Sequence, residues 1–297
     1  MGRNYDKKLK MKKEEFEVLC EDGVKLYGSL LIPENPKAVV QFNCGTATKK
    51  EFYLSFLTYL AENGYLCCLW NYRGTHKTDD LKNCDFHFSD YGIKDMPSIK
   101  KYLQNRFPEL PFLFVAHLAG GQQLGLIPDL SGVKGAVNIV VSAGYFPNMP
   151  FNYRMKAYFF FYMFSPLSIL FNGYVKSKPF EFMENLPKNV VLDWRKWCGK
   201  PKYFFDKSFY GKTVPIGNFQ NFEFPIHVFY STDDTISNTK NTKAFWSNIK
   251  TYKKIEFYEL KPSDFNLKVI DHFGYFKKNM KETLWAQILA KLDAFLD

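Results

Sequence analysis

Residues 112–122 decide the fold: Phe112-Leu113-Phe114-Val115-Ala116-His117-Leu118-Ala119-Gly120-Gly121-Gln122. The first half is an apolar run typical of a buried strand, and the small residues after it are typical of a helix that begins close to that strand. A strand, a sharp turn and a helix at this spacing indicate a nucleophile elbow, G-x-S-x-G, which presents a nucleophile at the end of a strand. Position 118 is the centre of that turn, and it holds leucine.

Leucine at position 118 removes the chemistry that such a turn normally carries. An isobutyl group neither attacks a carbonyl carbon nor exchanges a proton, so Leu118 occupies the nucleophile position without being a nucleophile. The residue at this turn normally has a strained backbone, at a cost of about 1–3 kcal/mol. Leucine gains nothing from that strain, so we expect either that the turn relaxes or that the Leu118 side chain plugs the pocket.

Apolar segments of strand length alternate with amphipathic segments of helix length on both sides of this elbow. Such alternation is typical of a parallel sheet with helices on both faces. Before it, residues 15–20 and 24–32 are predicted to form an antiparallel hairpin around Asp22-Gly23. The expected parallel strands are 38–42, 65–70, 112–116, 136–141, 225–230 and 254–260.

The alternation stops between residues 145 and 214, where the sequence is rich in aromatic residues and helical in pattern. We expect this insertion to cover the carboxyl edge of the sheet, where α/β proteins bind ligands. The predicted organisation is a mostly parallel α/β fold with antiparallel N-terminal strands, a basic tail (1–13), a core (14–144 and 215–297) and a helical cap (145–214).

Three further segments fall where the partners of a nucleophile are expected. Thr46 follows the first parallel strand, and its N–H is the candidate oxyanion donor together with that of Ala119. Asp234 follows the strand 225–230 as the candidate acid, and His272 follows the last strand as the candidate base. The chain order of nucleophile position, acid and base is the one that accompanies a nucleophile elbow.

Together these segments resemble the α/β-hydrolase superfamily, on its serine-aminopeptidase-like side, and are similar to a bacterial group of predicted α/β hydrolases. The resemblance covers nearly all of the chain after the tail. It implies hydrolysis of a carboxylic ester or amide by a serine, His272 and Asp234. The chain departs from the pattern at Asn71 (Asp), Ala116 (Gly) and Leu118 (Ser), and only the last departure removes what the chemistry needs. The matching segments are Asn71-Tyr72-Arg73-Gly74, Ala116 to Gln122, Asp193-Trp194-Arg195-Lys196-Trp197-Cys198, Tyr203-Phe204-Phe205-Asp206, Asp233-Asp234 and His272.

Other residues offer weaker routes to catalysis. Cys44, beside the oxyanion segment, is a candidate substitute nucleophile, although a small buried thiol is the simpler interpretation because no histidine adjoins it in the sequence. His272 with Asp234 can instead activate water as a general base, which is a feeble route without a covalent intermediate. His117 is interpreted as a packing residue beneath the elbow.

The amino-acid composition limits the classes of partner and ligand that the protein can be expected to bind. The net charge is +10, but no nucleic-acid-binding motif accompanies it, so we expect no nucleic-acid partner and at most a weak association with an anionic membrane surface. Aromatic residues make up 19% of the chain, and a cap rich in them suits an apolar small-molecule substrate or ligand. The longest apolar stretch, 157–171, is shorter than the roughly 20 residues of a membrane span. The six cysteines show no metal-ligand spacing, so we expect no metal, no other cofactor and a cytoplasmic location.

The sequence leaves three functions open. The protein is a hydrolase by descent with little or no activity, a pseudohydrolase that binds an apolar molecule under its cap, or an interaction protein whose basic surface meets membranes or acidic partners.

Overall fold

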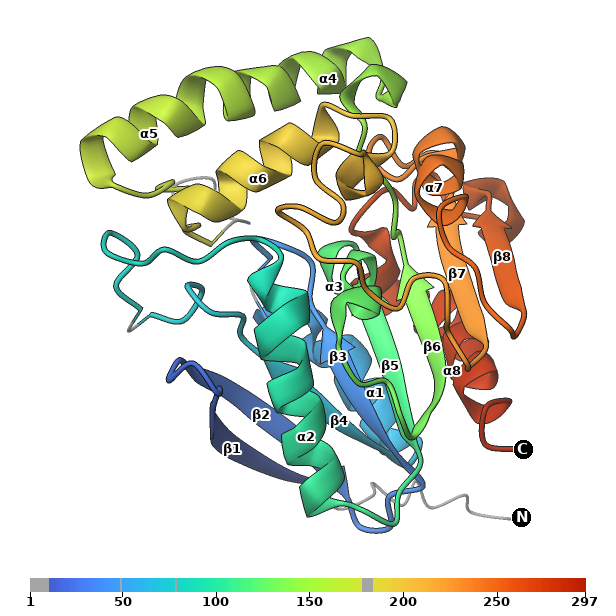
Figure 1. Ribbon diagram of the computed structural model, residues 1–297. Helices are drawn as coiled ribbons and strands as arrows, with labels where there is room; N and C mark the ends of the chain where they lie inside the picture. The colour runs from blue at the N-terminus through green and yellow to red at the C-terminus, as the bar shows by residue number, and fades with distance from the viewer. Residues whose placement is uncertain (1–10, 49, 78, 178–183) are drawn as a thin grey trace, which may run out of the picture.

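A single mixed sheet organises the chain, for which a computed structural model describes residues 11–48, 50–77, 79–177 and 184–297. The sheet has eight strands in the order β1-β2-β4-β3-β5-β6-β7-β8 (Figure 1). Neighbouring strands from β3 to β8 are parallel, whereas β2 is antiparallel to both β1 and β4, which confirms the predicted fold class. The strands are β1 (Met11–Leu19), β2 (Lys25–Pro33), β3 (Ala38–Asn43), β4 (Tyr65–Trp70), β5 (Phe112–His117), β6 (Val133–Ile139), β7 (Ile226–Ser231) and β8 (Ile255–Leu260).

The N-terminal hairpin turns where the Asp-Gly pair predicts it. Gly23 has a φ of 81°, a backbone conformation that only glycine adopts without steric cost. β1 begins at Met11 and pairs with β2 from its first residue, so residues 11–13 belong to the sheet rather than to the predicted tail. Lys12 and Lys13 form ion pairs with Glu14 and Glu15, so this basic segment is partly neutralised where it forms the edge strand of the sheet. The rest of the predicted tail, 1–10, lies outside the described residues.

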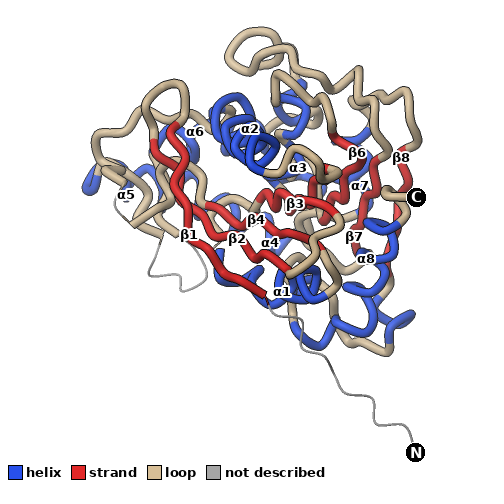
Figure 2. Tube along the Cα trace, turned by 90° about the horizontal axis from the view of Figure 1, so that it is seen from below, coloured by secondary structure: helices blue, strands red, loops and turns tan. Residues whose placement is uncertain are grey.

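Helices cover both faces of the sheet. Figure 2 shows α1 and α8 on one face and α2 on the other. Every residue of β3, β4, β5 and β7 is therefore buried, which explains why these strands are mostly apolar in sequence. The core helices are α1 (Leu54–Glu62), α2 (Met96–Arg106), α3 (Ala119–Gln122), α7 (Thr239–Trp246) and α8 (Ala286–Asp293). Shorter 3-10 or π segments are η1 (Lys50–Tyr53), η2 (Tyr91–Asp95), η3 (Leu124–Leu126), η4 (Phe146–Asn148), η6 (Tyr203–Phe205), η7 (Pro262–Phe265), η8 (Gly274–Phe276), η9 (Lys278–Met280) and η10 (Lys281–Trp285).

Between β6 and β7 the chain builds a helical layer above the carboxyl edge of the sheet (Figure 1). α4 (Phe151–Tyr158), η5 (Phe159–Phe164) and α5 (Ser165–Asn172) follow one another without a break, and we call them the cap helix. Below it α6 (Lys188–Cys198) packs on the core, with the rings of Trp197 and Phe88 stacked 5.0 Å apart. In the part of the chain that is described, no helix has the length and apolarity to cross a bilayer.

Candidate active site

The elbow keeps its strained geometry although it holds leucine. Leu118 connects β5 to α3 with φ 41° and ψ −106°, in a region that costs a residue with a Cβ about 1–3 kcal/mol. The expectation that the turn relaxes is therefore wrong. The reason is the packing of the glycines behind it, because a Cβ at Gly120 would lie 2.2 Å from the Asn43 carbonyl oxygen. A Cβ at Gly121 would lie 2.2 Å from Asn138 Oδ1, so the start of α3 is fixed against β3 and β6.

The Leu118 side chain lines a cavity instead of plugging it. Leu118 is only 7% exposed, and the cavity in front of it has a volume of about 600 Å³. Thr46, His117 and His272 line the same cavity, so the structure brings the oxyanion segment, the nucleophile position and the candidate base together. Such a volume lies within the range of small-molecule sites, about 300–1,000 Å³.

His272 and Asp234 form the acid–base pair that the sequence predicts. His272 Nδ1 donates to Asp234 Oδ2 at 2.8 Å, and both side chains are almost fully buried. The other carboxylate oxygen, Asp234 Oδ1, accepts the N–H groups of Ile236 and Ser237 at 2.7 and 2.8 Å. Three hydrogen bonds thus orient the carboxylate, and the carboxylate in turn orients the imidazole with Nε2 left for the cavity.

The neighbouring carboxylate, Asp233, holds the loop that carries the histidine. Its Oδ2 accepts the N–H groups of Ile270 and Asp271 at 2.8 and 3.1 Å. Asp271 has a φ of 56°, which turns the chain just before His272. Sequence reasoning missed this positioning role, although two adjacent aspartates after a strand are a visible signal.

The candidate oxyanion segment is a tight turn after β3. Ala47 has a φ of 62°, and Thr48 N–H donates to the Gly45 carbonyl at 3.3 Å. Within the described residues, neither the Thr46 N–H nor the Ala119 N–H donates to a backbone carbonyl, as an oxyanion hole requires. Thr46 Oγ1 is buried and has no hydrogen-bond partner among the residues that the structure describes. Because α3 has only four residues, its dipole adds little to these donors.

Behind this segment, His117 and Tyr53 form a buried contact that the sequence does not reveal. The Tyr53 hydroxyl accepts Gly45 N–H at 3.0 Å and lies 2.8 Å from His117 Nδ1, so it ties the oxyanion turn to the end of β5. Burial lowers the pKa of His117 well below its usual 6.5, and the neighbouring His272 acts in the same direction. His117 is a packing residue, as predicted, and it also lines the cavity.

A buried neutral histidine makes stability depend on pH. Below pH 6.5 the unfolded chain protonates His117 and the folded chain does not, so stability is present above pH 6.5 and is lost as the pH falls. The loss is at most about 1.4 kcal/mol per pH unit for one proton, until the lowered pKa is reached. Urea unfolding between pH 7.5 and 5 should show a shallower decline for His117→Asn than for the original chain. If the free energy of unfolding of both proteins fell equally with pH, this result would contradict a lowered pKa at His117.

The cavity is mostly apolar and lies between the cap and the edge of the sheet. Thr46, His117, Gln122 and His272 line it from the core, whereas most of the lining residues from the cap are aromatic or aliphatic. Tyr153 reaches this space from α4, and burial raises the pKa of its hydroxyl, with Asp234 and Asp271 acting in the same direction. Further lining residues from the cap region are Phe146, Met149, Met155, Lys156, Ala157, Phe159, Phe160, Phe161, Phe164, Trp194 and Cys198.

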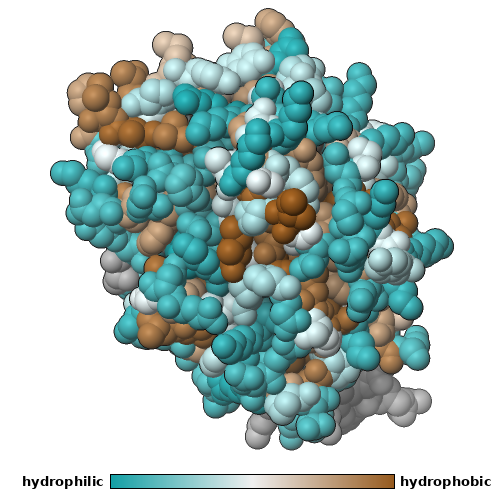
Figure 3. Space-filling model, in the orientation of Figure 1, coloured by the Kyte–Doolittle hydropathy of each residue, from teal (hydrophilic) through white to brown (hydrophobic). Residues whose placement is uncertain are grey.

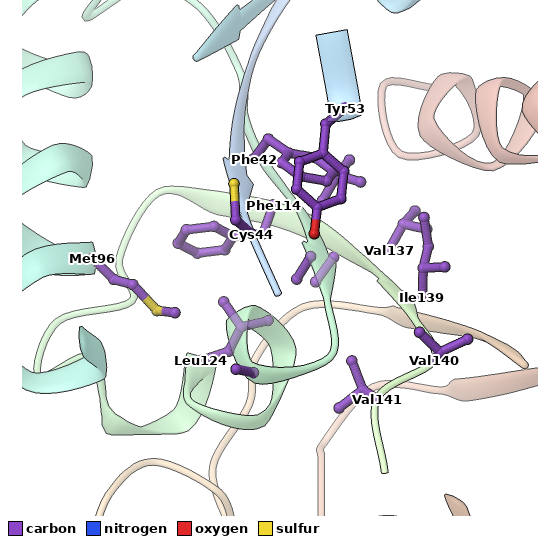
Figure 4. Close-up of a cluster of buried hydrophobic side chains, with 14 of the residues drawn as sticks. Phe42, Cys44, Tyr53, Met96, Phe114, Leu124, Val137, Ile139, Val140 and Val141 are labelled. Atoms are coloured by element: carbon purple, nitrogen blue, oxygen red, sulfur yellow. The ribbon is translucent and has the colours of Figure 1, made fainter. Parts of the chain in front are cut away.

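Cys44 does not lie in this cavity. Figure 4 shows it among buried apolar side chains. Its Sγ lies 3.8 Å from the Trp70 carbonyl, and burial raises the pKa of the thiol, which opposes thiolate formation. The simpler interpretation of Cys44 as a buried thiol therefore agrees with the structure. Among the described residues, no group of three or more His, Cys, Asp or Glu side chains is arranged to hold a metal ion.

Comparison with known proteins gives matches in structure but not in sequence. No protein-family model and no curated protein sequence matches the chain. A soluble variant of monoglyceride lipase from Saccharomyces cerevisiae, solved with a substrate analogue, matches with a TM-score of 0.64 at 16% identity over 97% of this chain and 95% of that one. An esterase from Pyrococcus furiosus matches with a TM-score of 0.58 at 15% identity, covering 100% and 96% of the two chains. A thermostable carboxyl esterase from Bacillus coagulans matches with a TM-score of 0.60 at 13% identity, covering 97% and 100%.

These matches extend over almost the whole chain and include both the sheet and the cap. At such low sequence identity, the matches establish the fold only. Any conclusion about activity must rest on the residues of the site. The chain has the α/β-hydrolase fold.

Proposed function

We propose that this protein binds an acyl-chain compound under its cap and hydrolyses carboxylic esters or amides little or not at all. The observation that carries the proposal is Leu118 at the nucleophile position, facing a large apolar cavity beside an intact His272–Asp234 pair. Descent from a serine hydrolase is supported by the retained elbow and by the structural likeness to esterases and a lipase. The narrower assignment to the serine-aminopeptidase-like side rests on the sequence motifs.

The expected loss of hydrolysis follows from the missing oxygen. A serine would attack the acyl carbon while His272 takes its proton, and the covalent intermediate would divide one difficult step into two easier ones. Without it, His272 can only activate water, and sites that lack their nucleophile retain a small fraction of the full rate. The position of Cys44 outside the cavity argues against a rerouted covalent mechanism.

The residues that line the cavity support a ligand with a polar head and an apolar tail. The head would lie near the Thr46 and Ala119 N–H groups and His272, where a carboxylate or ester oxygen finds donors. Thr46 Oγ1, which is buried and has no partner in the described part of the chain, offers one more polar contact there. The tail would lie among the rings of η5 and α6, which exclude water.

Decanoic acid, kept below its micellar concentration, is expected to stabilise the protein against heat. At a hundredfold excess over its dissociation constant, binding adds about 2.7 kcal/mol, which for a chain of this size raises Tm by about 5 °C. Ala157→Phe, which fills part of the cavity, should remove most of the shift, whereas Ala290→Phe on the exposed side of α8 should keep it. No shift in the original chain, or equal shifts in both variants, would contradict an acyl site under the cap.

We also propose a cytoplasmic location. All six cysteines are free, and five of them are buried, a state that a reducing compartment preserves.

A further inference from the structure

The outer face of the cap helix carries a stripe of exposed apolar side chains. They recur every three or four residues, singly or as adjacent pairs, which places them along one side of a helix. Each is between 48% and 80% exposed. Figure 3 shows hydrophobic residues gathered at the end of the cap where α5 lies. The members of this outer stripe are Phe151, Met155, Phe159, Tyr162, Met163, Leu167, Leu170 and Phe171.

The opposite face of the same helix already has its packing partners. Phe161 is buried, and its ring lies 5.1 Å from that of Trp194 on α6. The stripe is therefore additional to the apolar surface that holds the cap on the core. Contiguous exposed apolar surface of this kind marks a site of interaction with a membrane or another protein.

The charged residues within the segment that carries the stripe are of one sign. Residues 145–177 contain Arg154, Lys156 and Lys176 and no aspartate or glutamate. A second copy of this chain would bring these cations against their own counterparts, which opposes association through this face. An anionic lipid surface would instead meet both the apolar stripe and the basic residues, as interfacial amphipathic helices do.

The stripe is also continuous with the cavity. Met155 and Phe159 belong to the exposed face and at the same time line the space in front of Leu118. A molecule that leaves a bilayer at this face would pass along apolar side chains from the lipid to the site without crossing water.

We propose that the outer stripe of the cap helix docks on the surface of an anionic bilayer and that the cavity opens towards that surface. The helix lies in the plane of the interface, with its apolar side chains among the upper acyl groups and its basic side chains at the phosphates. Docking is reversible and weakens with salt, because part of it is electrostatic.

Co-sedimentation of the full chain with sucrose-loaded vesicles tests this proposal. We expect binding to vesicles of equal parts phosphatidylglycerol and phosphatidylcholine, and at least tenfold weaker partitioning to pure phosphatidylcholine. The double variant Leu170→Asp/Phe171→Asp should lower partitioning to the anionic vesicles at least tenfold. Its matched control is Leu19→Asp/Ile216→Asp, which replaces two exposed apolar residues outside the cap helix and changes the net charge by the same amount. The control should stay within twofold of the original chain, provided that circular dichroism shows both variants folded.

Two results would overturn the proposal. Equal loss in the stripe variant and its control would assign binding to net charge alone. A dimer that Leu170→Asp/Phe171→Asp dissociates, without vesicle binding by the original chain, would assign the face to a second copy. The vesicle lipids are themselves acyl esters, but the assay measures partitioning of the chain to the bilayer and not hydrolysis. Leu170 and Phe171 do not line the cavity, so loss of docking in their double variant is distinguishable from failure of the proposed function.

Discussion

Leu118→Ser is expected to raise the rate of ester hydrolysis by about 10³-fold or more, since the loss of a nucleophile costs up to about 10⁶ in other serine hydrolases. The remaining parts of the site are in place. His272 is held by Asp234 at 2.8 Å, and the elbow at position 118 already has the strained backbone that presents a side chain to the cavity. Serine and leucine both carry a Cβ, so the substitution adds no backbone strain.

The measurement compares p-nitrophenyl butanoate and octanoate as substrates. Leu118→Ala removes most of the side chain without supplying a hydroxyl, so it separates a larger pocket from a new nucleophile. Leu118→Ser/His272→Ala should return to the background rate, because an unassisted serine hydroxyl is a weak nucleophile. Covalent labelling of the Leu118→Ser variant by a fluorophosphonate, and not of the Leu118→Ala variant, gives a second readout.

The outcomes separate the explanations. Turnover by Leu118→Ser alone means that one side chain silences an otherwise complete site. No turnover and no labelling in either variant would mean that the oxyanion donors or the acyl pocket no longer suit a reaction. Substantial turnover by the original chain, lost in His272→Ala, would contradict the inference from Leu118 and make water activation the working mechanism.

Much of the fold and of the site could be predicted because local sequence patterns mark the strands, the turns and the residues that follow them. The sequence at 112–122 predicts both β5 and the turn after it, and Gly23 predicts the first hairpin. Asp234 and His272 could be placed because each follows a strand of the parallel sheet, and the carboxyl ends of such strands meet at one edge. Their contact is confirmed, whereas the catalytic roles of these residues stay predictions.

What could not be predicted depends on contacts between distant segments. The contact of Tyr53 with His117 joins η1 to β5, and the sequence of neither segment predicts this contact. The persistence of strain at Leu118 follows from the approach of Gly120 to Asn43, which is a property of the packed sheet. The aromatic-rich, helical pattern of residues 145–214 predicts the cap, but only the structure shows which face of the cap helix remains uncovered.

Gly120→Ala is expected to destabilise the protein by about 3 kcal/mol, the upper end of what overpacking usually costs. Its Cβ would lie 2.2 Å from the Asn43 carbonyl oxygen and 2.6 Å from the carbonyl carbon. Both are backbone atoms of β3, a strand paired on both sides, so neither can rotate away. Urea unfolding followed by tryptophan fluorescence measures the cost. Gly274→Ala is the control, because its Cβ would meet only ordinary contacts at 3.6 Å or beyond, and we expect a change within about 1 kcal/mol.

The same close approach sets the distance between the two halves of the candidate oxyanion hole. Thr46 follows β3 and Ala119 begins α3, so pushing α3 away from Asn43 also separates the two N–H donors. In the Leu118→Ser background, Gly120→Ala should therefore lower kcat more than it raises KM, because these donors act on charge that develops in the transition state. A Gly120→Ala variant as stable as the Gly274→Ala control would mean that the elbow has room to move, and the strain at Leu118 would then need another cause.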